Sequence, residues 1–191
     1  MMTEIQKKPM TKKRRFGLVL LFMAFFSVSY QIGSFVQVPA EEAQQLMNQF
    51  SEIAENIDGF GIFVHNITLN SLMFIPGFGV VWGIIASFQT GMAYSAFTTI
   101  EPMLKNFPAL GVLYLSPFGL MELFAYGIAM SRSFLITKKL IKRDESLKKD
   151  LKPITIEVGI MAGLLLAGAY LEYYMIQWAV DSGFDMTEML K

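Results

Sequence analysis

Apolar residues along the chain are gathered into long runs, most of them separated by short charged or acidic blocks, whereas the uncharged Pro76-Gly77-Phe78-Gly79 stretch divides the second run from the third. The runs cover about residues 16–36, 60–75, 80–100, 108–136 and 153–180. Most of them approach or exceed the ~20 residues that a helix needs to cross a bilayer. The pattern therefore predicts an all-α integral membrane helical bundle with about five transmembrane helices.

A different periodicity occupies residues 39–59, between the first two apolar runs. Leu46, Phe50, Ile53 and Ile57 follow one another at steps of four, three and four residues, which places them on one face of a helix. Acidic and amide side chains fill the other face. We predict an external amphipathic helix that covers one end of the bundle, and a docking surface for an extracytoplasmic partner is the alternative.

Composition supports a membrane protein and gives it an orientation. Hydrophobic residues make up 53% of the 191 residues and charged residues 17%, against roughly 25% in soluble chains. Residues 1–15 and 138–152 are rich in Lys and Arg. With five crossings both basic blocks fall on one side, which the positive-inside bias makes cytoplasmic.

The expected organisation has three parts. A basic cytoplasmic N-terminus (1–15) precedes a membrane domain (16–180) that includes the amphipathic helix, and an acidic external tail (181–191) follows. We expect a multi-pass protein of the cell membrane whose N-terminus is cytoplasmic and whose C-terminus is extracytoplasmic.

Small residues recur at every fourth position of the third apolar run, and a shorter strip of this kind lies in the fifth run. Such strips let transmembrane helices approach closely, so both are predicted to be helix-packing faces. Proline and glycine together predict helix breaks at two further places. The strips are Gly79, Gly83, Ser87, Gly91 and Ser95, then Gly159 and Gly163, and the breaks are at Pro76, Gly77, Pro117 and Gly119.

Four polar side chains are predicted to form an intramembrane polar cluster: Asn66, Asn70, Gln89 and Glu122. Asn66 and Asn70 are one turn apart and share a helix face. Glu122 is the one charged residue from Phe107 to Ala129, and a carboxylate at mid-membrane costs at least ~2.5 kcal/mol. We predict that it meets one of the two asparagines. The cluster is either a structural hub that joins helices or a polar path for an ion.

Residues for catalysis are scarce. The chain has no cysteine and a single histidine, His65, which leaves no ligand set for a membrane metalloprotease and no pattern for a serine hydrolase. We therefore expect a non-enzymatic protein with no cofactor and no metal. The expected partners are membrane lipids and other proteins of a membrane complex, with no nucleic acid and no identified small-molecule substrate.

An asparagine-bearing second run, a Pro-Gly turn and a glycine-marked third run are followed by the motif Pro-x-Gly-x-x-Glu-Leu-x-Ala. This order resembles the stage II sporulation protein M family over about residues 60–180. Two positions differ, because the family commonly has His where Phe118 stands and Asn where Thr90 stands. The motif reads Pro117-Phe118-Gly119-Leu120-Met121-Glu122-Leu123-Phe124-Ala125.

The resemblance implies a polytopic, non-enzymatic membrane protein, which in spore formers is a scaffold for partners that cut peptidoglycan during engulfment. The expected function is a scaffold or accessory subunit that assembles partner proteins. The alternative is a transporter or channel-like component that uses a polar intramembrane path at Glu122.

Overall fold

The computed structural model describes residues 10–181, and within them every regular element is a helix. The predicted acidic tail lies outside the described residues except for its first residue, as do the first nine residues of the basic N-terminus. The elements are α1 (Lys12–Gly33), α2 (Ala40–Asn56), α3 (Gly59–Met73), α4 (Gly79–Ile100), η1 (Pro102–Asn106), α5 (Ala109–Leu115), α6 (Pro117–Ile141), η2 (Glu145–Asp150) and α7 (Leu151–Asp181).

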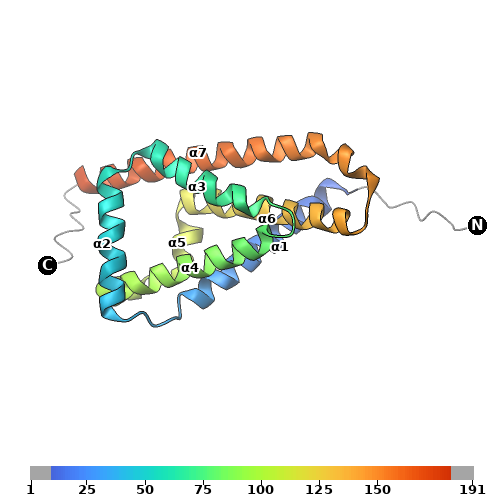
Figure 1. Cartoon of the computed structure of the whole chain (residues 1–191). Coiled ribbons are helices and arrows are strands. Elements are labelled where there is room, and N and C mark those ends of the chain that lie inside the picture. The colour runs from blue at the N-terminus through green and yellow to red at the C-terminus, as the bar shows by residue number, and fades with distance from the viewer. Residues whose placement is uncertain (1–9, 182–191) are drawn as a thin grey trace, which may run out of the picture.

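The helices give the molecule two distinct ends (Figure 1). The start of α1, the α3–α4 turn and the α6–α7 connection lie toward one end, which we call the basic end because both lysine- and arginine-rich blocks reach it. α2, α5 and the later part of α7 lie toward the other, which we call the outer end. α4 runs parallel to α1, whereas α3 and α6 run in the opposite direction.

Among the described residues, three helices are long and apolar enough to cross a membrane, judged by length and composition: α1, α6 and the Leu151–Trp178 part of α7. α3 has 15 residues and is therefore about 22 Å long, short of the ~30 Å hydrocarbon core. α4 has 22 residues and is not among these three helices. These features support association with a membrane, and the count of five crossings stays a prediction.

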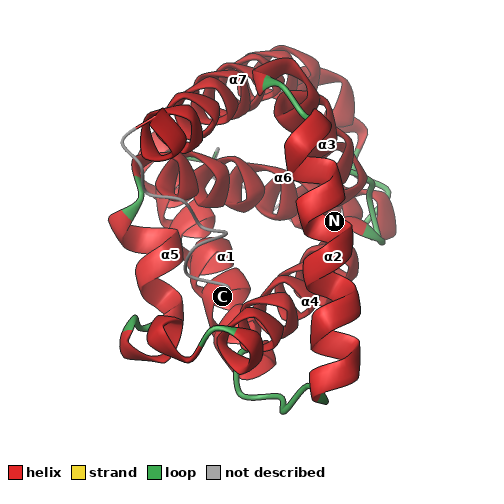
Figure 2. Ribbon diagram, turned by 90° about the vertical axis from the view of Figure 1, so that its left-hand side faces the viewer, coloured by secondary structure: helices red, strands yellow, loops and turns green. Residues whose placement is uncertain are grey.

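α2 lies across the outer end of the bundle, between the α1–α4 pair and the start of α3 (Figures 1 and 2). Ala43 is fully buried against α4, and the rings of Phe50 and Phe97 meet edge to face with centroids 5.0 Å apart. The helix ends before Gly59, because the Asp58 carboxylate accepts a hydrogen bond from the Gly61 N–H and starts α3 instead. Gly59 is thus part of α3.

The strip of small residues on α4 forms a close seam with two other helices, and all five of its members are buried. A Cβ atom on Gly83 would lie 2.6 Å from Met130 Sδ of α6, and one on Gly91 would collide with the Tyr30 carbonyl of α1. The Ser95 hydroxyl donates to the Val36 carbonyl at 2.5 Å. α4 therefore approaches α6 near the basic end and α1 near the outer end, without room for larger side chains.

The strip predicted on α7 packs against no other described part of the chain, which corrects the sequence-based assignment. Gly159 and Gly163 are exposed, and a Cβ atom on either would meet nothing within 4 Å. The buried face of α7 carries Met161, Leu165 and Ala169 instead. These residues are offset by two positions from the glycines, and two residues turn an α-helix by about 200°, so the glycines face outward.

The predicted helix break at Pro76 and Gly77 is a tight turn between α3 and α4. Gly77 has φ +81°, a conformation that glycine adopts without strain. Its N–H donates to Thr137 Oγ1 at 2.6 Å, and Ser133 Oγ donates to the Ile75 carbonyl at 2.7 Å. Two hydroxyl groups of α6 therefore satisfy backbone groups that an apolar turn would otherwise leave without partners.

Candidate functional site

α6 places Glu122 on its second turn, and the sequence of the preceding residues explains where that helix begins. Pro117 stands in the first turn of α6, where its missing N–H is not needed. Ser116 is extended and caps the helix by accepting from the Gly119 N–H at 3.1 Å. A Cβ atom on Gly119 would meet the Val112 carbonyl at 2.7 Å, so the glycine lets the end of α5 lie against α6.

Glu122 meets Asn66 across the α3–α6 interface, as the sequence predicts for one of the two asparagines. The amide Nδ2 of Asn66 donates to Glu122 Oε1 at 2.6 Å, and the Asn66 side chain is buried. An amide donor keeps the acceptor oxygen satisfied without a cation, which suits a carboxyl group away from water. The contact joins residues that are 56 positions apart in the chain.

Tyr126 and Glu172 complete this group, which we call the outer polar cluster (Asn66, Glu122, Tyr126 and Glu172). Tyr126 follows Glu122 by one turn of α6, and its hydroxyl is close enough to interact with the same carboxyl group. Glu172, on α7, is close enough to Glu122 for the two carboxyl groups to interact electrostatically. Within the described residues, neither carboxyl group has a cationic partner. Three helices thus bring two acids, an amide and a phenol together.

Asn70 is one turn beyond Asn66 on α3 and is fully buried. Among the described residues, neither its amide nitrogen nor its amide oxygen has a hydrogen-bond partner. A buried polar group without a partner costs about 1–3 kcal/mol. Asn70 is therefore an exception to the usual pairing of buried polar atoms, and it lies on the helix that contributes Asn66 to the cluster.

Gln89 does not belong to the cluster, which corrects the prediction that grouped it with Glu122. It is exposed, and it lies two residues from both Ser87 and Gly91 of the buried seam. Because two residues turn a helix by about 200°, burial of the seam directs Gln89 to the opposite face of α4.

A second charged group lies near the basic end, and sequence reasoning missed it. We call it the inner ion triad (Arg15, Arg132 and Glu157). Arg15 Nε and Nη2 lie 2.7 and 2.8 Å from the two carboxylate oxygens of Glu157, and Arg132 Nε and Nη2 lie 2.7 and 2.5 Å from the same oxygens. Arg15 also donates to Ser131 Oγ at 2.6 Å. Both arginines therefore bind the same Glu157 carboxylate, each through two parallel hydrogen bonds.

The triad ties α1, α6 and α7 together where all three are near the basic end. Only 5% of the Arg132 side chain and 14% of the Glu157 side chain are exposed. The sequence contained a signal for this arrangement, because Arg15, Arg132 and Glu157 each stand near the basic-end terminus of a predicted span. Opposite charges at a common depth are expected to pair, since an isolated charge there is costly.

The family model of Stage II sporulation protein M matches residues 16–175, most of the chain. The chain belongs to this family. No curated protein and no solved structure matches it. The match extends from α1 into α7 and includes every member of the outer polar cluster. It also includes Arg132 and Glu157 of the inner ion triad, while Arg15 lies just before its start.

The motif that carried the resemblance has a clear structural role in this member of the stage II sporulation protein M family. It covers the start of α6, where Pro117 and Gly119 set the helix start and Glu122 enters the outer polar cluster. Phe118, at the position where His is common, lies against α7, with its carbonyl 3.6 Å from the Cβ position of Gly168. Within the described residues, no group of three or more His, Asp or Glu side chains is placed to hold a metal ion.

Proposed function

We propose that the protein is a non-enzymatic scaffold or accessory subunit of the cell membrane that assembles partner proteins. In this proposal five segments cross the bilayer: α1, α3, α4, the α5–α6 pair and α7. The N-terminus is cytoplasmic and the C-terminus extracytoplasmic. Family membership supports a membrane protein, and the three long apolar helices support its insertion.

The direction of the helices supports the five crossings. A Cβ atom on Gly79 of α4 would approach Ser133 of α6, and one on Gly59 of α3 would approach Tyr170 of α7, so each of these pairs is antiparallel. Consecutive segments thus alternate in direction between the basic end and the outer end. This order puts Lys12 and Lys138 on one side, as the positive-inside bias requires.

The observation that carries the scaffold proposal is the internal pairing of the polar side chains. Asn66 binds Glu122, and two arginines bind Glu157, so these groups join helices of the same chain. Neither of two surface recesses, of about 200 and 300 Å³, is lined by a member of either group. Such an interior favours a rigid platform over a conducting path.

The partner surface in this proposal is the outer face of α2. Glu41 and Glu42 are exposed in the first turn of α2. Ala43, the next residue, is buried against α4. An anchored helix with acidic side chains directed away from the bundle can present them to a basic partner without itself unfolding.

The experiment compares affinity recovery of partners from membranes solubilised in mild detergent, with quantitative mass spectrometry. The scaffold proposal predicts that Glu41→Gln/Glu42→Gln loses partners that wild type recovers. The matched control Gln44→Ala/Gln45→Ala changes two exposed side chains of the same helix and should retain them. Equal recovery by both variants would remove α2 from the proposal, and absence of any reproducible partner of wild type would overturn the scaffold role.

One alternative has an observation of its own. Asn70 is buried without a hydrogen-bond partner in the described structure, and Glu122 and Glu172 lie together without a cation. A transporter or channel-like component would use such groups as stations for an ion. The alternative predicts that Glu122→Gln abolishes ion flux in proteoliposomes while partner recovery is unchanged, and the scaffold proposal predicts no flux to abolish.

A further inference from the structure

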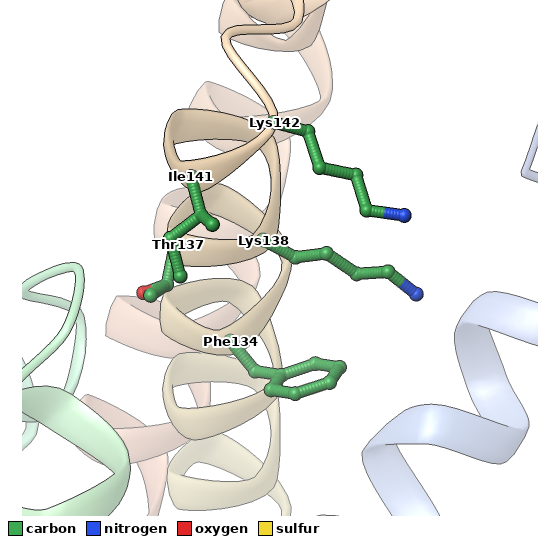
Figure 3. A pocket seen from close by; sticks show the side chains of 5 residues that line it. All are labelled: Phe134, Thr137, Lys138, Ile141 and Lys142. Carbon is green, nitrogen blue, oxygen red and sulfur yellow. The ribbon is translucent and has the colours of Figure 1, made fainter.

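The basic end of α6 carries a shallow recess of about 200 Å³ that takes no part in either polar group (Figure 3). Phe134, Lys138 and Lys142 follow one another at intervals of four residues and so share one face of the helix. Figure 3 shows their side chains pointing in the same direction. Thr137 and Ile141 complete the lining.

The two lysines of the recess have no acidic partner within the described part of the chain, and both are exposed. The neighbouring Lys139 differs, because its Nζ lies 2.6 Å from Asp150 Oδ2 and 3.2 Å from Ser146 Oγ. The Thr137 hydroxyl is also engaged, since it accepts from the Gly77 N–H and donates to the Ser133 carbonyl. The recess therefore offers to an anion two ammonium groups that no described acidic side chain compensates.

The recess changes character along the helix axis. Phe134 lies about 6 Å deeper along α6 than Lys138 and 40% of it is exposed, within a helix apolar enough to cross a membrane. Lys142 lies as far again toward the basic end. The depth profile of a lipid leaflet has the same order, because apolar acyl chains lie inside and charged headgroups lie at its surface. This gradient favours a lipid, because a water-soluble anion could use the lysines but not the aromatic ring.

We propose that the recess is a binding site for an anionic phospholipid. Lys138 and Lys142 bind phosphate oxygens of the headgroup through charge-assisted hydrogen bonds, and Phe134 packs against an acyl chain. The lipid belongs to the leaflet at the basic end. That leaflet is cytoplasmic if the proposed orientation is right, whereas the lipid binding itself depends on neither the orientation nor the scaffold role.

The test uses the full chain purified in mild detergent and titrated with dioleoyl phosphatidylglycerol, with bound lipid counted by native mass spectrometry. Each lysine is expected to contribute roughly fivefold in affinity, so Lys138→Gln/Lys142→Gln should weaken binding about 25-fold. The control Lys12→Gln/Lys152→Gln removes the same charge from exposed positions outside the recess and should stay within about threefold of wild type. Equal losses in the two variants would overturn the site.

Two further arms identify what is bound. Dioleoyl phosphatidylcholine, with no net charge, should bind at least about tenfold more weakly than the anionic lipid. Glycerophosphoglycerol, the headgroup without chains, should not compete with the lipid, and competition at equal concentration would show a phosphate site instead. Phe134→Ala should weaken lipid binding several-fold. Because Phe134 also contacts the Phe22 ring, the thermal stability of this variant in detergent is measured in parallel. Unchanged binding by a stable Phe134→Ala variant would overturn the acyl-chain contact.

Discussion

The outer polar cluster and the inner ion triad share two helices, α6 and α7, yet they satisfy their acids in different ways. In the outer cluster an amide and a phenol surround Glu122, and a second acid, Glu172, lies nearby. In the inner triad two guanidinium groups hold the single carboxylate of Glu157. One group thus has acids without bases, and the other has an excess of base.

This difference teaches how the two ends of the bundle are distinguished. Arginine is available at the basic end, where α1 starts, and its long side chain reaches inward to a carboxylate on another helix. At the outer end the hydrogen bond that Glu122 accepts comes from the neutral Asn66 amide, which adds no charge. The triad is therefore an electrostatic joint, and the cluster is a joint of hydrogen bonds whose strength depends less on charge.

The largest effect is expected from breaking the triad. Glu157→Gln leaves two arginines facing one another, and the Arg132 side chain is only 5% exposed. Removing one partner of a buried ion pair costs about 3–5 kcal/mol, and partial exposure of Arg15 puts the expected loss near the lower limit. Unfolding of the detergent-solubilised protein measures it. Glu172→Gln is the control at the outer end and should lose less than about 1 kcal/mol, and equal losses would contradict the comparison.

The seam on α4 connects the two regions, since it contacts Met130 near the triad and Tyr30 nearer the outer end. Gly83→Leu and Gly91→Leu should each destabilise by about 1–3 kcal/mol or prevent folding, because the added side chain meets atoms already in contact. Gly163→Leu adds the same atoms to an exposed position and should change thermal stability by less than about 0.5 kcal/mol. Normal expression and stability of both seam variants would show that the helices can separate there.

The hydrogen bond of the outer cluster predicts a smaller effect. Glu122→Leu leaves the buried Asn66 amide without its acceptor and should cost about 1–2 kcal/mol. Glu122→Gln keeps the size and an acceptor oxygen, so its stability should stay within about 0.5 kcal/mol of wild type. The same unfolding measurement checks both. A large loss of stability in Glu122→Gln would mean that the negative charge of Glu122 stabilises the fold. The outer polar cluster would then depend on charge as the inner ion triad does.

Asn70 provides the smallest effect and the only gain. Asn70→Leu replaces a fully buried amide that has no partner in the described structure by an apolar side chain of similar volume. The change should leave stability equal or raise it by up to about 1 kcal/mol, because no hydrogen bond is lost. A loss above about 1 kcal/mol in thermal unfolding would show that the amide makes a hydrogen bond to a partner outside the described residues.

The pattern of small and polar residues predicted one joint and missed the other. Spacing by four placed Asn66 and Asn70 on one face, and the lone Glu122 required a polar partner, so their proximity followed from the cost of polar groups in lipid. The triad was missed because arginines near span ends, such as Arg15 and Arg132, can also reach water, so their position near the end of a span was a weaker signal than the lone acid. Spacing by four failed at Gly159 and Gly163, since a strip of small residues does not say whether a helix of the same chain covers it.

The most direct test of the central claim, that the two regions face opposite sides of a membrane, is labelling of single cysteines in intact cells. The chain has no cysteine, so each substitution is seen alone. A membrane-impermeant thiol reagent should label Asn48→Cys on α2 and Lys105→Cys in η1, both exposed at the outer end. Lys152→Cys, exposed at the basic end, should react only after the cells are permeabilised. Labelling of Lys152→Cys in intact cells, or protection of the other two, would contradict the proposed orientation.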